Sequence, residues 1–113
     1  MRGEAKRDME GVPIACDPAA LTAEQRERKR SLQRLLGANL RELRELENGY
    51  AFRHSPNEIV LLALAEFVAL ERLCCPFFDF GIEVGRSGGP VWFRMTGEEQ
   101  AKIVLEAELG ISA

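Results

Sequence analysis

The hydrophobic positions of the chain are densest in one stretch, residues 55–80. Between residues 59 and 73 only three side chains are polar, namely Glu66, Glu71 and Arg72. A helix that is apolar almost all round is buried on more than one side or spans a membrane. The uncharged run of residues 59–65 is far shorter than the roughly 20 residues that a membrane span needs. The pattern therefore predicts a buried central helix and no membrane association.

Signals at both ends of this stretch predict where the helix begins and ends. Ser55 is a good N-cap, Pro56 suits the first helical position, and Glu58 completes a capping box. Pro76 cannot continue the helix, and the residue before a proline is pushed out of helical geometry. The stripe expected to face the core consists of Ile59, Leu62, Ala63, Phe67 and Leu70.

A second helix is predicted earlier in the chain, opened by Thr22 with Gln25 in a capping box and ended at Gly37. Its first half is polar and carries most of the five basic residues Arg26, Arg28, Lys29, Arg30 and Arg34. These charges suit either a phosphate or partner contact or a solvated face with a Glu24–Arg28 pair. The solvated face is favoured, because no aromatic platform or groove-reading motif accompanies the charges.

Two hairpins are predicted around the central helix. Asn48-Gly49 is a strong hairpin signal, and alternation places Tyr50, Phe52 and His54 on one face of the strand that follows. The strand before it is less regular, because its leucines are spaced by three, which also suits a helix. Alternating residues 78–84, a turn at residues 85–89 and alternating residues 91–95 predict the second hairpin.

The last helix is expected after this hairpin. Thr96 is the predicted cap, with Glu99 three positions later, and Gly110 ends the helix. Its buried stripe is expected to be Ala101, Val104, Leu105 and Leu109.

The predicted order is helix, hairpin, helix, hairpin, helix. The most economical assembly is an α+β fold in which a four-stranded antiparallel sheet packs on the central apolar helix. Residues 14–110 would form a single domain, preceded by a polar, flexible arm of residues 1–13. Residues 12–17 read as an edge strand or an extended arm, which could bring Cys16 towards the core.

Composition narrows the function classes. The chain has 113 residues and a formal net charge of −3, which gives no general attraction to nucleic acid or to an anionic membrane. No N-terminal apolar run resembles a signal peptide. Three cysteines, two of them adjacent, do not make a disulfide framework. Reduced thiols and a cytoplasmic location are therefore expected.

Three short stretches carry a resemblance to other sequences: residues 49–52 (GYAF), residues 69–77 (ALERLCCPF) and residues 88–92 (GGPVW). With them, the segment from about residue 14 to residue 109 resembles a set of small uncharacterised bacterial proteins that share an ERxCCPF-type stretch. The resemblance implies that the whole chain is one domain, and it implies no reaction.

The candidate chemistry lies where the central helix ends. Cys74 and Cys75 are adjacent there, and Glu71 precedes them by one helical turn. Two thiols and a carboxylate could ligate a thiophilic metal ion such as Zn, with Cys16 or His54 completing the shell. The spacing matches no standard structural zinc pattern. The alternative interpretation is that the thiols are buried packing residues, because free cysteine behaves as a small hydrophobe.

Electrostatics argue against a catalytic thiol. A thiolate nucleophile is helped by a helix N-terminus or by cations, whereas Cys74 and Cys75 stand at a helix C-terminus beside Glu71. For Glu66, for His54 and for the neighbours Trp92 and Phe93, a structural role is favoured over a functional one. Glu66 is expected to be exposed or paired with a base, His54 to be capped or exposed, and either Trp92 or Phe93 to face outward.

The sequence thus favours a small cytoplasmic protein, more plausibly a binding protein than an enzyme. Its site would comprise Cys74, Cys75, Glu71 and Cys16, and would hold a soft metal ion or a thiophilic oxyanion such as arsenite. The rival hypothesis is a metal-free module with structural cysteines that forms a homodimer or docks a partner.

Overall fold

A four-stranded sheet and three helices make up the computed structural model, which describes residues 15–111. The expected flexible arm of residues 1–13 lies outside the described residues. The elements are η1 (Pro18–Ala20), α2 (Ala23–Ala38), β1 (Leu40–Leu46), β2 (Gly49–His54), α3 (Glu58–Cys74), β3 (Asp79–Val84), β4 (Val91–Thr96) and α4 (Glu99–Leu109).

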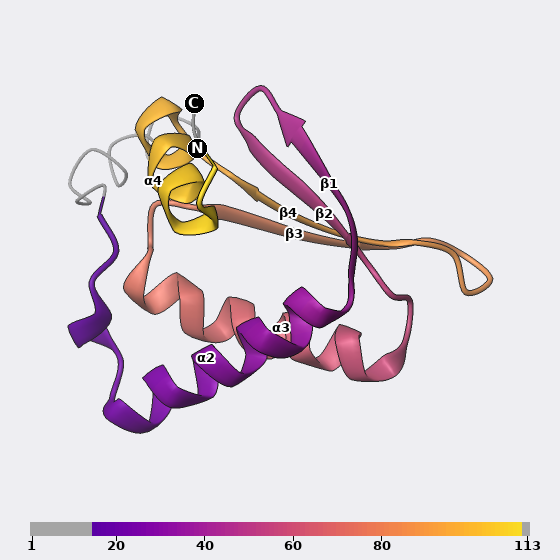
Figure 1. Ribbon diagram of the computed structural model, residues 1–113, viewed down its shortest axis with the longest axis horizontal. Coiled ribbons are helices and arrows are strands. Elements are labelled where there is room, and N and C mark those ends of the chain that lie inside the picture. The colour runs from indigo at the N-terminus through magenta and orange to yellow at the C-terminus, as the bar shows by residue number, and fades with distance from the viewer. Residues whose placement is uncertain (1–14, 112–113) are drawn as a thin grey trace, which may run out of the picture.

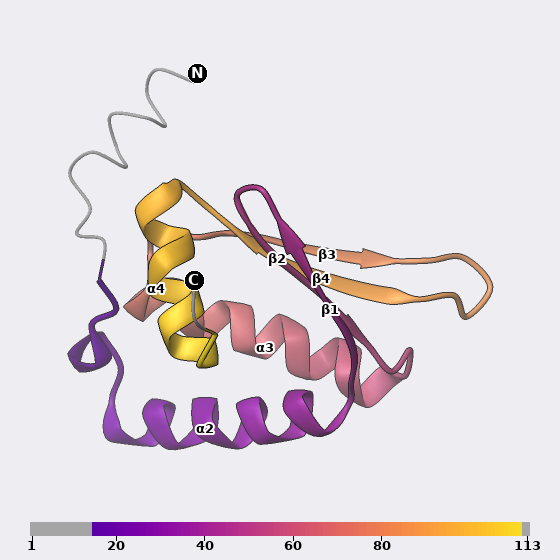
Figure 2. The same ribbon diagram turned by 45° about the horizontal axis from the view of Figure 1, so that its top comes forward.

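The strands lie in the order β1-β2-β4-β3, and every neighbouring pair is antiparallel. The predicted α+β class, with three helices and a four-stranded antiparallel sheet, is confirmed. Figures 1 and 2 show α2 and α3 on the same side of the sheet, with α4 crossing at the end where β4 leaves it. The core therefore lies between one face of the sheet and the helices.

Aromatic side chains of the two central strands anchor α3 to this face. Phe52 of β2 is the register partner of Phe93 of β4, and their ring centroids are 5.8 Å apart. Phe67 of α3 meets Phe93 edge-on at 6.0 Å. Each of these three rings is at least nine-tenths buried. Burying a large apolar side chain contributes about 1.5–3 kcal/mol, so this contact is a major support of the fold.

A bulge explains the irregular leucine spacing of β1. Leu40 is the partner of His54, and Leu43 is the partner of Phe52, with the register shifting between Leu40 and Glu42. A bulge inserts one extra residue into a strand, so the two leucines can lie on the same face although they are three positions apart. The spacing that also suited a helix belongs to a bulged strand.

The first hairpin forms where Asn48-Gly49 predicts it, but the turn lies one residue earlier than that dipeptide. Leu46 pairs with Gly49, so the turn residues are Glu47 and Asn48, and Gly49 is already in the strand. A Cβ at position 49 would collide with the carbonyl oxygen of Met95. Gly49 is therefore required by the close approach of β4.

The helix α2 has the predicted capping box. The N–H of Gln25 donates to Thr22 Oγ1 at 3.0 Å, and the N–H of Thr22 donates to Gln25 Oε1 at 2.9 Å. The helix continues through Gly37 to Ala38, so the predicted end at Gly37 is wrong. Asn39 caps it instead, and its Nδ2 donates to the carbonyl of Leu35 at 2.8 Å.

The predicted caps of the other two helices are wrong. The N-cap of α3 is Asn57, whose side chain accepts the N–H of Val60 at 2.9 Å. Ser55, the predicted cap, has its N–H bound to the carbonyl of Asn39 and so stays with the sheet. Thr96 remains paired in β4, and α4 begins after Glu98 without a side-chain cap.

The helix α3 is buried along one face only. Val60, Leu64 and Cys74 have almost no exposed surface, whereas Ile59 and Leu62 are about two-thirds exposed, at 66% and 67%. The prediction that Ile59 and Leu62 face the core is therefore wrong. Among residues 15–111, no helix combines the length and the hydrophobicity that crossing a membrane would require.

The last helix follows its prediction more closely. Ala101 and Leu105 are buried and Val104 is half-buried, but Leu109 is exposed, so the predicted stripe is one residue too long. The predicted end is confirmed, because Gly110 caps α4 with a left-handed φ of 72°. This placement leaves the last turn of α4 beside the end of α3.

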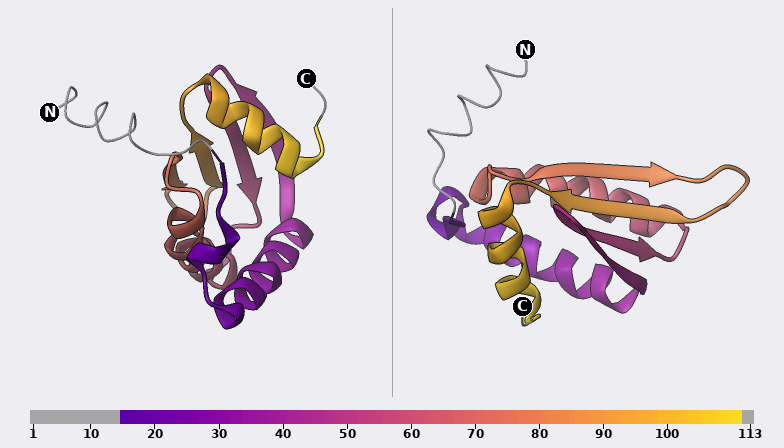
Figure 3. Two further views of the ribbon diagram at one scale, coloured as in Figure 1. Left: turned by 90° about the vertical axis from the view of Figure 1, so that its left-hand side faces the viewer. Right: turned by 90° about the horizontal axis from the view of Figure 1, so that it is seen from above.

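The other face of the sheet carries charged side chains and a single large aromatic. The guanidinium of Arg44 stacks over the Trp92 ring, 4.6 Å from its centroid. Trp92 is half-buried and Phe93 is buried, so Trp92 is the one that turns away from the core. In the two views of Figure 3, none of the described helices covers this face.

Candidate thiol site

The end of α3 brings the cysteines together with the start of the described chain. Cys74 is the last residue of α3, and Cys75 is its C-cap, with its N–H bound to the carbonyl of Glu71 at 2.8 Å. The N–H of Asp17 donates to the carbonyl of Cys74 at 2.8 Å. This backbone contact holds the neighbouring Cys16 over the helix end. Residues 15–17 form no strand, so of the two predicted alternatives the edge strand does not hold for these residues.

Cys16 and Cys75 are joined by a disulfide that links positions 59 residues apart, with a Cα–Cα distance of 4.6 Å. The prediction of three reduced thiols is therefore wrong for these two residues. Adjacent cysteines seldom bridge each other because their Cα atoms are too close. Folding supplies a more distant partner, and Cys74 is left as the free thiol.

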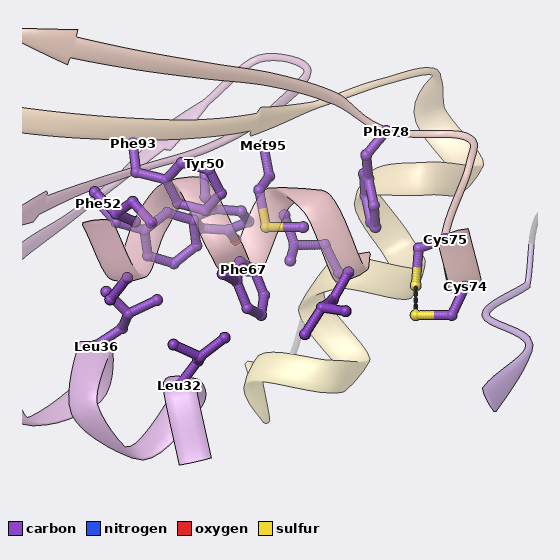
Figure 4. Packing of buried hydrophobic residues seen from close by; sticks show 14 of the residues in the cluster. Leu32, Leu36, Tyr50, Phe52, Phe67, Cys74, Cys75, Phe78, Phe93 and Met95 are labelled. Atoms are coloured by element: carbon purple, nitrogen blue, oxygen red, sulfur yellow. Dashed lines mark hydrogen bonds between the residues drawn. The ribbon is translucent and has the colours of Figure 1, made fainter. Parts of the chain in front are cut away.

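The free thiol of Cys74 is buried and surrounded by polar groups. Its Sγ lies 3.7 Å from Cys75 Sγ, 3.6 Å from Glu71 Oε1 and 3.3 Å from Lys29 Nζ. Figure 4 shows the sulfur atoms of Cys74 and Cys75 turned towards each other. Burial and the charge of Glu71 raise the pKa of the Cys74 thiol, although Lys29 opposes them. A thiol with a raised pKa is a poor nucleophile at neutral pH.

The charge of Glu71 is buried and paired. Glu71 is only 1% exposed, and its Oε1 lies 2.5 Å from Lys29 Nζ on α2. Burial disfavours the charge of Lys29, but the hydrogen bond and the attraction of Glu71 outweigh it and raise the pKa of Lys29. The ammonium group thus lies against both Glu71 and Cys74.

Glu108 of α4 closes the cluster from the other side. Glu108 is exposed as a whole residue, but its Oε1 lies 2.7 Å from Cys16 Sγ and 4.0 Å from Cys75 Sγ. A disulfide sulfur has no proton, so a hydrogen bond here must be donated by a protonated Glu108. Burial of its carboxyl and the nearby charge of Glu71 raise the pKa of Glu108, although Lys29 opposes them.

Two overlapping sets of side chains could hold a metal ion, and they share Cys75. One is Cys16, Cys75 and Glu108, and the other is Glu71, Cys74 and Cys75. Within each set the potential ligand atoms all lie within 4.8 Å of one another. The four residues predicted from the sequence therefore lie together in the structure. His54, the alternative ligand, belongs to neither set.

Sequence reasoning missed Lys29 and Glu108. Lys29 was grouped with the basic residues of α2, yet it lies three positions before Leu32 and seven before Leu36. That spacing puts it on the buried face of the helix, and it is the signal that could have identified it. Glu108 follows the buried Leu105 by three positions, but the packing of α4 against the disulfide could not be read from the sequence.

The other basic residues of α2 support the solvated-face interpretation. Arg28 makes a two-pronged contact with Glu66 of α3, at 2.8 and 2.7 Å, and the predicted Glu24–Arg28 pair is not formed. The pairing expected for Glu66 is confirmed, and Arg28 lowers its pKa. Arg30 pairs with Glu27, and Arg26 donates to backbone carbonyls.

A cavity of about 420 Å³ lies next to the thiol cluster, between α2, the sheet and α4. Its apolar wall includes Phe52, Phe67, Phe93, Met95, Leu36 and Leu105. Three of its polar lining residues are Glu71, Glu108 and His54. His54 is buried rather than capped or exposed as expected, its Nδ1 has no hydrogen-bond partner among the described residues, and burial lowers its pKa.

Comparison with known proteins adds no assignment. No protein-family model matches the chain, and neither a curated protein nor a solved structure matches it significantly. The resemblance to small bacterial proteins with an ERxCCPF-type stretch stays a prediction.

Proposed function

We propose that this is a small cytoplasmic protein that binds a soft metal ion or a thiophilic oxyanion such as arsenite through its cysteines. The observation that carries the proposal is the convergence of three sulfur atoms and two carboxylates at the end of α3. Thiolates are the protein ligands that select Cu(I), Zn²⁺ and similar soft centres.

The spacing of the two adjacent sulfurs supports this proposal for the reduced protein. Two thiolates bound to one tetrahedral Zn²⁺ at about 2.3 Å each are separated by about 3.8 Å. The sulfurs of Cys74 and Cys75 are 3.7 Å apart. The adjacent thiols therefore need little movement to share one ion, and Glu71 Oε1 is near enough to contribute an oxygen ligand.

Binding requires the disulfide to be reduced, because a disulfide sulfur is not a thiolate ligand. Glutathione and thioredoxin keep thiols reduced in the cytosol. Reduction frees Cys16 and Cys75 beside Cys74, so the cluster then offers three thiols. The disulfide and the ligand-binding form are thus alternative states of the same residues.

Lys29 gives the ligand-free cluster a counter-charge. Its ammonium contacts both the Glu71 carboxylate and the Cys74 sulfur, and it neutralises a carboxylate that is otherwise costly to bury. A bound cation would neutralise the Glu71 carboxylate in place of Lys29. It would also favour the deprotonated form of the thiols that bind it. The site can thus exist without a metal and still accept one.

The experiment is a titration of the reduced, oxygen-free protein with Zn²⁺ and, separately, with arsenite. We expect one equivalent of ligand per chain in the unmodified protein and none in a Cys74→Ser, Cys75→Ser variant. Arg72→Ser is the matched control, because Arg72 is exposed and beside the cluster in sequence but belongs to neither set of ligands. Equal binding by the double variant would overturn the proposal.

A second candidate function is a metal-free module that forms a homodimer. It is favoured by the exposed Ile59 and Leu62 of α3, together with Ile82 and Val84 of the edge strand β3. An unpaired edge strand with apolar side chains is a ready template for pairing with another chain. A symmetric β3–β3 contact would bury these residues around a two-fold axis.

Light scattering during size-exclusion chromatography separates the two candidates. A dimer that persists after cysteine replacement and dissociates in a Leu62→Glu variant favours the module. An Arg34→Glu variant is the control, because it changes charge on an exposed site of α2 away from β3. A monomer at all concentrations removes this candidate.

A further inference from the structure

We propose that the ligand of the thiol cluster carries an organic group, and that the cavity beside the cluster holds that group. The ligand would be a trivalent arsenic or comparable thiophilic centre bearing an aromatic or large aliphatic substituent. This inference rests on the proposed function, which it extends from the bound atom to the rest of the molecule.

Two residues belong to both the cavity lining and the thiol cluster. Glu71 and Glu108 both line the cavity. The carboxylate of Glu71 is 3.6 Å from Cys74 Sγ, and that of Glu108 is 4.0 Å from Cys75 Sγ. The described cysteines do not line the cavity themselves, so a substituent on a centre bound to these sulfurs would enter it by displacing the side chain of Glu71 or Glu108.

The cavity has the size and lining of a small-molecule site. Ligand pockets typically have volumes of about 300–1,000 Å³ and mostly apolar walls with a few polar groups, and this cavity has about 420 Å³. Phe52, Phe67 and Phe93 provide aromatic faces. A phenyl ring can stack on these faces and lose its contact with water.

One residue that lines the cavity has a buried polar atom without a partner. His54 is 4% exposed, and its buried Nδ1 has no hydrogen-bond partner among residues 15–111. A buried polar atom without a partner costs free energy. His54 lines the cavity, so an occupant that hydrogen-bonds with this nitrogen would relieve that cost.

The binding step involves no oxidation or reduction at arsenic. An organoarsonous acid has one arsenic–carbon bond and two hydroxyl groups. Two thiols displace the two hydroxyls, so two As–O bonds break, two As–S bonds form, and the thiol protons leave in two water molecules. The As–C bond is kept, and it directs the organic group away from the sulfurs. The disulfide must first be reduced by an added phosphine, because a dithiol reductant would itself bind the arsenic.

Gly37 offers a way to block the cavity without disturbing the thiols. It lines the cavity from α2, and a Cβ at this position would meet no atom within 4 Å. Gly37→Trp adds bulk to the cavity, and Gly37→Ala is the matched control. Leu109→Trp, from the exposed end of α4 on the opposite wall, is a second blocking variant if Gly37→Trp does not fold.

The experiment compares methylarsonous acid with phenylarsonous acid, prepared from phenylarsine oxide, on the prereduced protein and its variants. Even small additions to a ligand in an apolar pocket change affinity by about tenfold or more. We expect at least about a tenfold preference for the phenyl compound in the unmodified protein and in Gly37→Ala. In Gly37→Trp or Leu109→Trp the preference should fall towards unity, with binding of the methyl compound unchanged.

The results separate the inference from the function on which it rests. Equal affinity for the two compounds in the unmodified protein, or a phenyl preference that both blocking variants retain, would overturn the inference while leaving thiol binding intact. Failure of both compounds to bind would overturn the inference, and the proposed function would fall with it only if Zn²⁺ and arsenite also do not bind.

Discussion

Lys29 on α2 and Glu71 on α3 form a buried ion pair, with Nζ and Oε1 2.5 Å apart and Glu71 only 1% exposed. The same ammonium contacts the sulfur of Cys74 at 3.3 Å. The pair therefore joins the packing of two helices to the charge balance of the thiol cluster.

Removing the ammonium group of Lys29 should lower the free energy of unfolding. Lys29→Met leaves the Glu71 carboxylate buried without its partner, and breaking a buried pair in this way costs about 3–5 kcal/mol. Arg28→Met is the control, because it removes an ion pair with Glu66 that is exposed on both sides, and exposed pairs contribute about 0–1 kcal/mol. Urea unfolding measures both losses. Equal losses would contradict the assignment of Glu71 as a buried charge.

The cluster was only partly predictable from the sequence. Glu71, Cys74 and Cys75 lie within one helical turn, so their proximity follows from helix geometry. The approach of Cys16 depends on a backbone hydrogen bond from Asp17 to Cys74, which leaves no trace in the sequence. A disulfide between Cys16 and Cys75 needs that approach, and so it could not be foreseen.

The disulfide should leave one thiol per chain free to react. Alkylation of the unreduced, denatured protein is expected to modify only Cys74, and alkylation after reduction should modify all three cysteines. Mass spectrometry of the intact chain counts the modified thiols. Three reactive thiols in protein purified without reductant would contradict the bond.

Stability should depend on the disulfide under oxidising conditions. For a closed loop of this length, the chain-entropy relation gives about 4 kcal/mol. Cys16→Ser should therefore lower the unfolding free energy by up to about that amount without reductant, and by much less with reductant. Cys74→Ser is the control, because Cys74 is not bonded.

His54 should make the protein less stable in mild acid. Burial lowers the pKa of His54 below its ordinary 6.5, so the unfolded chain takes up a proton at a higher pH than the folded one. The stability that this group contributes is fully present above the ordinary value and is lost as the pH falls through it. Thermal unfolding between about pH 7 and pH 5 should show a steeper loss in the unmodified protein than in His54→Leu. Parallel curves would mean that His54 is not buried in its neutral form.

Two glycines should respond to alanine in opposite directions. Gly49→Ala drives a methyl group into the carbonyl oxygen of Met95, and such overpacking costs about 1–3 kcal/mol. Gly37 lies inside α2 with free space around it, so Gly37→Ala should stabilise the helix by about 0.5–1 kcal/mol. Chemical denaturation of both variants checks the sign of each change.

The fold was more predictable than its details. Alternation predicted β2, β3 and β4, and the turn signal at Asn48-Gly49 predicted β1. Capping signals and apolar stretches predicted the helices. The helix starts failed where two good caps compete, since Asn57 rather than Ser55 opens α3. Competition with the sheet also kept Thr96 from capping α4. The buried face of α3 was misassigned because nearly all its faces are apolar, so exposure depends on which neighbours are present.

Native mass spectrometry of the reduced chain, mixed with a slight excess of arsenite or Zn²⁺, shows whether the cysteines at the end of α3 bind a ligand. We expect one bound centre per chain, retained in the Arg72→Ser control and absent when Cys74 and Cys75 are both replaced by serine. An unliganded chain under these conditions, or the same occupancy in the serine variant, would contradict this expectation.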